Sequence, residues 1–412
     1  FKLLLHFKFF KTMFRRFILI LVLPLFLFSL SASAQFTPDV SLLGGLNALK
    51  VGVPFLLIAP DSRAGSMGDV GVASTPDVNS QHWNPAKYAF IDNEWGVGLS
   101  YTPWLRNLIN DINLTYVSGF HRFDDQQVVS ATLLYFSLGS ITFTNDQGEF
   151  QQTHNANEFA FDAAYSRKFS ERISGSLAFR FIRSDLTGGF SQQGQPDAKP
   201  GNAVSADIST YYQAPIVIDD KDGEFALGLN ISNIGTKISY NDEKIKDFIP
   251  INMRLGGRIT LNFDSYNAMS FMLDGNKLLV PTPPIYQRDD NGDDVIVFGM
   301  DPDVAVTMGI LQSFYDAPGG FKEELSEISI ATGIEYVYAK QFTIRAGYFD
   351  EHANKGNRKY FTLGAGLKYN VFNLDFAYLI PRAGQTNPLA NTVRFTIGFD
   401  FESSCKKKNR RK

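Results

Sequence analysis

Apolar residues alternate with polar or small residues along four successive segments in the C-terminal third of the chain. In the last of them, TVRFTIGFDF, residues Val393, Phe395, Ile397, Phe399 and Phe401 are apolar, and the residues between them are polar or small. The same period of two runs through ISIATGIEYVY (328–338), FTLGAGLKY (361–369) and FNLDFAY (372–378). Side chains of a β-strand point alternately to its two faces, so each segment predicts a strand with one apolar and one polar face.

Similar segments upstream bring the number of expected strands to fourteen. They begin near Glu94, Asp111, Val128, Asn157, Ile173, Asn202, Phe225, Ile251, Ser265 and Phe342. An even number of strands closes a barrel with both chain termini on the same side of the membrane. Outer-membrane barrels have short turns at the periplasmic end and long loops at the outer end. We therefore predict an all-β fold, a 14-stranded transmembrane outer-membrane β-barrel. The alternative is a soluble exported β-sandwich, which also alternates but does not explain an alternation of loop lengths.

The connections between the expected strands alternate in length. Short ones are expected at 123–127, 168–172, 263–267, 339–341 and 369–372, and long ones at 102–110, 144–156, 184–201, 241–250, 281–325 and 381–391. The stretch IVIDDKDGE (216–224) is an exception, because it is longer than a tight turn where a short connection is expected. The strands follow from the period of two alone, so the alternation of loop lengths is independent support for their number.

The N-terminal residues have the features of an export signal. Arg15 and Arg16 precede an apolar run from Phe17 to Leu30, and Ala32-Ser33-Ala34 is typical of a cleavage site. We expect a signal peptide that starts at Met13 and is removed after Ala34, because the apolar run is too short for a membrane-spanning helix. No later stretch has eighteen consecutive apolar residues. The aromatic content of 14% in an exported chain is typical of a transmembrane barrel.

Charge and cysteine content exclude several classes of function. Residues 1–34 hold five of the 39 Lys and Arg residues and none of the 42 acidic ones, and six further basic residues lie in the last seven, KKKNRRK. The acidic body between them speaks against a nucleic-acid partner. Cys405 is the only cysteine, so the chain has neither an internal disulfide nor a cysteine metal site. The basic tail is expected in the periplasm.

Residues 61–90, DSRAGSMGDVGVASTPDVNSQHWNPAKYAF, are rich in glycine and precede the first expected strand. Gly65, Gly68 and Gly71 have neither the G-x-G-x-x-G nor the P-loop spacing, so a phosphate site is not expected. Small residues allow close backbone contacts. We predict that the segment folds compactly and enters the barrel as a plug, with Trp83 and Tyr88 as packing residues.

The remaining candidates lie in the longest expected loop and among the histidines. The cluster DDNGDD (289–294) suits a hairpin tip with Asn291-Gly292 better than a calcium loop, because Asp294 stands where an EF-hand needs glycine. The mature histidines are widely separated, and no G-x-S-x-G marks a nucleophile, so no catalytic residue, metal or cofactor is expected. The apolar stretch from Val304 to Phe314 either packs over the barrel mouth or binds a protein partner. The candidate contact residues of the outer loops are Trp104, Leu105, Val306, Met308, Ile310, Leu311 and Phe314.

The segment RAGSMGDVGVASTPDVNSQHWNPAKYAF resembles the N-terminal part of the PorV family of type IX secretion proteins. SFYDAPGGFKEELSEISI (313–330) is also similar to that family, and the looser pattern with Asn84-Pro85-Ala86 is similar to FadL-like barrels. The residues that carry the resemblance, and that it implies for the plug, are Arg63, Gly65, Gly68, Asp69, Asn79, Trp83, Asn84 and Pro85. One departure is the tail of eleven residues after Phe401, since many barrels end on a terminal aromatic residue.

The resemblance implies a FadL-like barrel in the outer membrane, with an N-terminal hatch and no catalytic activity of its own in secretion. It implies four kinds of partner: an SprA-type translocon barrel, cargo with type IX C-terminal domains, a PorU-containing attachment complex and membrane lipid. The expected organisation is a signal peptide with upstream extension (1–34), a plug (35–93), a barrel (94–401) and a basic tail (402–412). The alternatives are a FadL-like channel for hydrophobic small molecules and a lipopolysaccharide O-deacylation factor.

Overall fold

The computed structural model describes residues 47–104, 111–145, 147–190, 198–241, 246–382 and 392–401. The chain divides into two units, Phe1–Gly44 and Gly45–Lys412, and the described residues all belong to the second. The expected signal peptide, the first part of the plug (35–46), Leu105, Cys405 and the basic tail lie outside the described residues.

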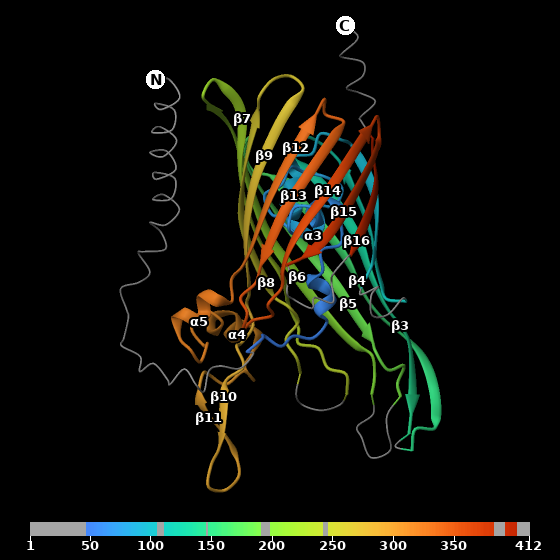
Figure 1. Cartoon of the computed structure of the whole chain (residues 1–412), viewed down its shortest axis with the longest axis vertical. Helices are drawn as coiled ribbons and strands as arrows, with labels where there is room; N and C mark the ends of the chain where they lie inside the picture. The colour runs from blue at the N-terminus through green and yellow to red at the C-terminus, as the bar shows by residue number, and fades with distance from the viewer. Residues whose placement is uncertain are drawn as a thin grey trace. The chain divides into compact units, whose positions relative to one another are not determined.

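Fourteen of the strands in the described residues form one closed antiparallel barrel (Figure 1). Each strand pairs with its neighbour in the chain, except that β9 pairs with β12, and β1 pairs with β16 to close the barrel from Trp95↔Phe401 to Tyr101↔Phe395. The barrel strands are β1 (Trp95–Pro103), β2 (Asn113–Arg122), β3 (Gln127–Thr144), β4 (Phe150–Lys168), β5 (Ile173–Asp185), β6 (Gly201–Ile218), β7 (Lys221–Gly235), β8 (Asn252–Asn262), β9 (Asn267–Leu278), β12 (Ser329–Tyr338), β13 (Phe342–Asp350), β14 (Lys359–Tyr369), β15 (Phe372–Pro381) and β16 (Val393–Phe401). The predicted number of strands is confirmed.

The connections show the expected alternation of lengths, with two corrections. Residues 216–224 are not an unusually long connection: β6 and β7 are joined by Asp219 and Asp220 alone, both with positive φ, as a two-residue hairpin turn requires. Residues 144–156 are not a long loop: β3 and β4 continue as a paired ribbon to Thr144↔Phe150. We call the end with the long connections the outer rim, because long loops of such barrels face outward.

The two faces of the barrel wall differ as the sequence predicts. In β16, Phe395, Ile397 and Phe399 are exposed on the outer face, while Arg394 and Thr396 are buried on the inner face. The other strands repeat this pattern, with exposed aromatic and aliphatic side chains outside and buried serine, threonine and charged side chains inside. The outer wall therefore suits lipid and the inner wall suits polar contacts.

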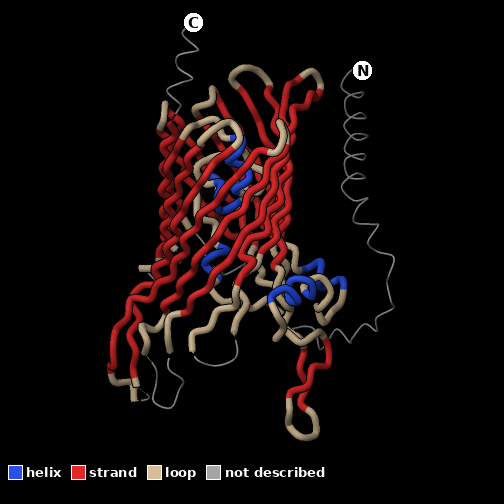
Figure 2. The backbone as a smooth tube through the Cα atoms, turned by 180° about the vertical axis from the view of Figure 1, so that it is seen from behind, coloured by secondary structure: helices blue, strands red, loops and turns tan. Residues whose placement is uncertain are grey.

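Two insertions complete the described structure. The luminal segment, residues 53–93, runs from the outer rim into the barrel (Figures 1 and 2) and contains four short helices: η1 (Pro54–Leu57), α2 (Ser62–Gly65), α3 (Ser80–Trp83) and η2 (Pro85–Phe90). Residues 47–52 lie at the outer rim, where Asn47 donates to Glu323. The outer excursion, residues 279–328, joins β9 to β12 at the outer rim. It contains the hairpin of β10 (Ile285–Arg288) and β11 (Asp294–Phe298) and the helices α4 (Val306–Gln312) and α5 (Phe321–Ser326). Among the described residues, no helix is long and apolar enough to cross a bilayer.

Candidate functional site

The luminal segment is hydrogen-bonded to the inner wall on all sides of the barrel. Backbone N–H groups donate to wall side chains: Ser62 to Thr396 Oγ1 at 2.8 Å, Gly68 to Thr362 Oγ1 at 2.8 Å, and Gly71 to Asp274 Oδ2 at 2.7 Å. On the opposite side, Ser166 Oγ and Ser174 Oγ donate to the carbonyl oxygens of Pro85 and Ala86 at 2.7 and 2.6 Å. Short polar side chains of the inner wall thus satisfy a backbone that has little regular structure of its own.

Charged groups fix the middle of the luminal segment. Arg63 donates to both carboxylate oxygens of Glu335 on β12, at 3.1 and 3.0 Å, and to Asp77 at 2.8 Å. Glu335 also accepts from Arg345 Nε at 2.7 Å, so one buried carboxylate lies between two guanidinium groups. Asp69 accepts from Tyr360 at 2.5 Å and from Arg394 at 3.0 Å. Arg63, Glu335, Asp69 and Arg394 thus each have a partner of opposite sign, which buried ions need.

The other predicted plug residues shape the backbone of the luminal segment. Asn84 Oδ1 accepts from Ala86 N–H and caps η2, while its Nδ2 donates to the carbonyl oxygen of Thr210 on β6 at 3.0 Å. Asn79 Oδ1 accepts from Ser118 Oγ on β2 at 3.2 Å. Pro85 starts η2 immediately after its cap. These contacts give the Asn-Pro-Ala pattern a local structural reason.

Trp83 and the glycines let the segment pack tightly. Trp83 is buried, and its Nε1–H donates to Asp61 Oδ1 at 2.7 Å. A Cβ on Gly65 would overlap the side chain of Arg394. Gly68 has φ +71°, and a Cβ there would lie 2.6 Å from the carbonyl oxygen of Tyr348. Only glycine fits at position 68 without strain, since both the dihedral and the space exclude a side chain.

A hydrophobic cluster fills the barrel mouth at the outer rim. It joins Val53 and Phe55 of the luminal segment to Leu134 and Phe136 of β3 and to Ile249 before β8. The predicted contact residues Trp104, Val306 and Ile310 pack against this cluster. Met308, Leu311 and Phe314 are instead 50%, 61% and 47% exposed. One side of the apolar stretch therefore packs over the mouth, and the other side is exposed. Binding of a protein partner by the exposed side stays a prediction.

Five charged residues, which nothing in their spacing groups together, hold the outer excursion to the barrel. Lys277 on β9 donates to Glu324 at 3.0 Å and to Glu327 at 2.6 Å, and Lys355 donates to Glu327 at 3.0 Å. Lys355 also donates to Glu323 at 2.6 Å. Burial raises the pKa of Glu324. At Glu323 burial is the largest influence and acts in the same direction, but the hydrogen bonds from Lys355, Gly319 and Asn47 and the charge of Lys355 together outweigh it, and the pKa is lowered.

The acidic cluster at 289–294 forms the tip of the β10–β11 hairpin, as predicted. Asp289 Oδ1 accepts from the backbone N–H groups of Asn291 and Asp293, each at 2.9 Å, and Gly292 has φ +86°. The carboxylate thus serves the turn itself. The described part of the chain holds no group of three or more His, Cys, Asp or Glu residues arranged to bind a metal.

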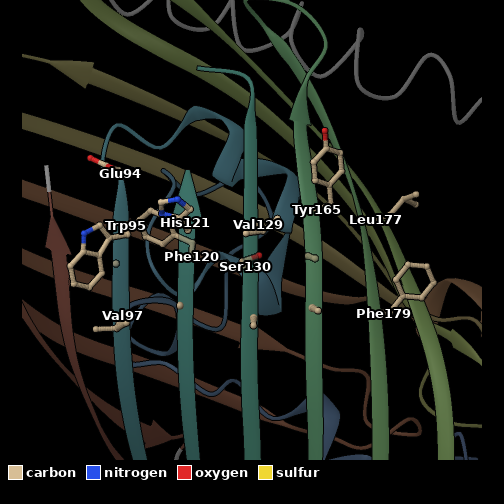
Figure 3. A pocket seen from close by; sticks show the side chains of 15 residues that line it. Glu94, Trp95, Val97, Phe120, His121, Val129, Ser130, Tyr165, Leu177 and Phe179 are labelled. Atoms are coloured by element: carbon tan, nitrogen blue, oxygen red, sulfur yellow. The ribbon is translucent and has the colours of Figure 1, made fainter. Parts of the chain in front are cut away.

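A groove of about 1070 Å³ runs over the outer wall of β1 to β5 near the short-turn end (Figure 3). Its lining is largely apolar. Small residues such as Gly119, Ala131 and Ala163 leave room between the larger Trp95 and Phe179. None of the predicted site residues lies in it. Because it opens on the lipid-facing wall, its lining suits hydrocarbon chains.

A closed barrel with an apolar outer wall and a polar interior pairs the backbone of its wall internally, which is what a bilayer demands of a spanning sheet. The chain is an outer-membrane β-barrel protein. It matches the family model of the type IX secretion system protein PorV over residues 45–285, more than half of its length. The chain belongs to the PorV family.

Solved structures with similar folds include channels and transporters. The Pseudomonas putida toluene transporter TodX is 11% identical with a TM-score of 0.46, covering 87% of this chain and 100% of that chain. A Pseudomonas aeruginosa FadL homologue is 10% identical with a TM-score of 0.40, covering 83% of this chain and 98% of that chain. No curated protein matches the chain. The fold assignment stands on the strand pairing itself.

Proposed function

We propose that the protein is the cargo-binding shuttle subunit of a type IX secretion system. It captures the C-terminal signal domains of secreted proteins at an SprA-type translocon barrel and delivers them to a PorU-containing attachment complex on the cell surface. Membership of the PorV family supports the secretion role. The shuttle role needs a binding surface at the outer rim and no open passage through the barrel.

The observation that carries this proposal is that one side of helix α4 is packed against the barrel mouth and the other side is exposed. Val306 and Ile310 anchor the helix to the mouth cluster, while Met308 and Leu311 project from the opposite side. An exposed apolar surface on a rigid support is typical of a recognition site. The luminal segment, which we propose acts as a plug, occupies the barrel interior, so binding at the outer rim is favoured over transport through the lumen.

The test is affinity purification of the tagged full-length protein from its native membrane. The wild type is expected to bring down translocon and cargo, and a Met308→Asp/Leu311→Asp variant is expected to lose at least the cargo. Val295→Asp/Val297→Asp is the matched control, because these residues are similarly exposed on the neighbouring hairpin. Deleting residues 304–314 is a poorer test, since it also removes part of the mouth cluster.

Three outcomes would contradict the proposal. Full retention of cargo by the α4 variant would exclude this surface. A wild type that carries a bound hydrophobic small molecule and no protein would favour a channel. Hydrolysis of lipopolysaccharide acyl chains by the purified protein would favour deacylation.

A further inference from the structure

Helix α5 has acidic residues on its buried side, and its apolar residues lie on the exposed side together with Lys322. Glu324 and Glu327, at its end, are buried, whereas Phe321 is 73% and Leu325 is 46% exposed. A surface helix of a globular protein normally has the opposite arrangement, with its polar face toward water. The exposed face of α5 is therefore not suited to an aqueous surrounding.

The ion pairs show which part of the barrel α5 covers. On β9, the exposed Phe271 and Leu273 mark the outward-facing row, and the period of two places Gly275 and Lys277 in the same row. Lys277 is the residue that binds Glu324 and Glu327. Its Nζ also lies 5.9 Å from the centre of the Phe314 ring. Helix α5 is thus held against the outer wall of the barrel, beside the mouth.

The apolar face of α5 continues without interruption into the lipid-facing wall. Phe321 and Leu325 are spaced i and i+4, which places them on one side of α5, and Ile328, two residues beyond the end of the helix, is also exposed. Ile328 lies next to Gly275 in the outward-facing row. The apolar surface then continues along β12 through Ile330 and Ile334, which are 48% and 40% exposed. The surface that contacts lipid on the barrel wall and the face of α5 form one apolar surface.

We propose that α5 is an interfacial helix, whose Phe321 and Leu325 rest in the outer leaflet of the membrane where acyl chains meet headgroups. Aromatic residues concentrate at that level of outer-membrane barrels, and Tyr315, 58% exposed, precedes the helix. Lys322 is exposed beside Phe321, where a cation meets anionic headgroups. The ligand is thus a lipid surface, contacted by α5 and not by the α4 residues Met308 and Leu311.

This arrangement explains why the buried ion pairs are needed. An interfacial helix of six residues is too short to be stable alone in water. Lys277 and Lys355 hold it by its charged face, which leaves the apolar face free for lipid. The proposal does not depend on cargo capture, because a barrel of any function could carry such a helix.

The experiment uses the full-length protein with Cys405→Ser and one nitroxide-labelled cysteine, in vesicles of phosphatidylcholine and phosphatidylglycerol. Labels are placed by Phe321→Cys and Leu325→Cys, and the matched controls are Val295→Cys and Val297→Cys on the β10–β11 hairpin. All four positions are exposed, so folding is expected to be retained. Power saturation of the spectrum compares access of oxygen, which partitions into hydrocarbon, with access of a water-soluble nickel chelate.

Labels at 321 and 325 are expected to be several-fold less accessible to nickel than those at 295 and 297, with oxygen access raised. Equal nickel access at all four positions would overturn the proposal. Protection that appears only in native membranes containing other secretion proteins would also overturn it, in favour of a protein partner. Phe321→Trp gives a second readout: brominated acyl chains are expected to quench more of its emission than that of the wild type, whose Trp95 already faces lipid, and no such increase is expected for Val295→Trp.

Discussion

The luminal segment and the outer excursion are both held to the barrel by buried ion pairs, but they face opposite surroundings. Arg63 of the luminal segment meets Glu335 on the inner wall. Glu324 and Glu327 of the outer excursion meet Lys277 in the outward-facing row of β9. In the lumen, polar contacts extend all round the segment, whereas on α5 they are confined to one side and the other is apolar.

The difference follows from the different side chains on the inner and outer faces of the barrel wall. The inner wall consists of serine, threonine and charged side chains, which can satisfy an irregular backbone. The outer wall offers almost no hydrogen bonds, so an element placed over it needs a charged residue such as Lys277 as an anchor. The luminal segment is accordingly fixed along its length, and α5 mainly at one cluster.

The largest effect is expected from Arg63→Ala in the luminal segment. The change leaves Asp77 without its guanidinium partner and Glu335 with Arg345 alone. Loss of one partner of a buried pair costs about 3–5 kcal/mol, and we expect the lower end because Arg345 remains. Hydrogen exchange of residues 61–83 should accelerate, while the heat-dependent gel shift of the closed barrel persists. Unchanged exchange would show that these ion pairs do not hold the segment.

A smaller effect is expected from Glu327→Gln in the outer excursion. The amide keeps the shape of Glu327 but removes the charge that lies between Lys277 and Lys355. Weakening of such charged hydrogen bonds costs about 1–3 kcal/mol. Hydrogen exchange of α5 should accelerate and that of residues 61–83 should not. If both regions respond, the two attachments are coupled and the comparison fails.

The sequence predicted the barrel well because lipid imposes the period of two on every spanning strand. The prediction of strand bounds failed in the parts of the strands where lipid does not impose this period. Strand β4 begins at Phe150, but alternation placed its start near Asn157, because FQQTHNA has no apolar face. That part of the ribbon is held by backbone pairing, which leaves no trace in hydrophobicity. The tight turn at Asp219-Asp220 was missed because strand residues Lys221 to Glu224 are themselves polar.

The sites were predictable to a smaller extent. Asn84 and Pro85 were named because they carry the family resemblance, and their role in capping and starting η2 became evident only in the structure. Lys277 and Lys355 could not be assigned to Glu324 and Glu327, because only the closed barrel brings these distant residues together. The i, i+4 spacing of Phe321 and Leu325 is present in the sequence. The sequence does not show that Glu324 and Glu327 face the barrel, and so it does not show that the apolar side of α5 is exposed.

A still smaller loss of stability is expected for Gly68→Ala. This change tests the fit of the luminal segment to the wall without changing a charge. The dihedral φ of +71° and the close carbonyl of Tyr348 both oppose a Cβ. Strain at such a position costs about 1–2 kcal/mol. The midpoint of thermal unfolding should fall, and exchange should accelerate near residue 68. Gly292→Ala is the matched control, since Gly292 also has positive φ but no atom within 4 Å of the added Cβ.

The smallest effect is expected for Arg288→Ala in the β10–β11 hairpin. Arg288 pairs with Asp294 at 3.5 Å, and the two side chains are 79% and 64% exposed. Exposed pairs gain little because water screens them, so stability should change by about 0.5 kcal/mol or less. Thermal unfolding and exchange of α5 should both match the wild type. A loss as large as that of Arg63→Ala would mean that the number of ion pairs, and not their burial, determines how the insertions are held.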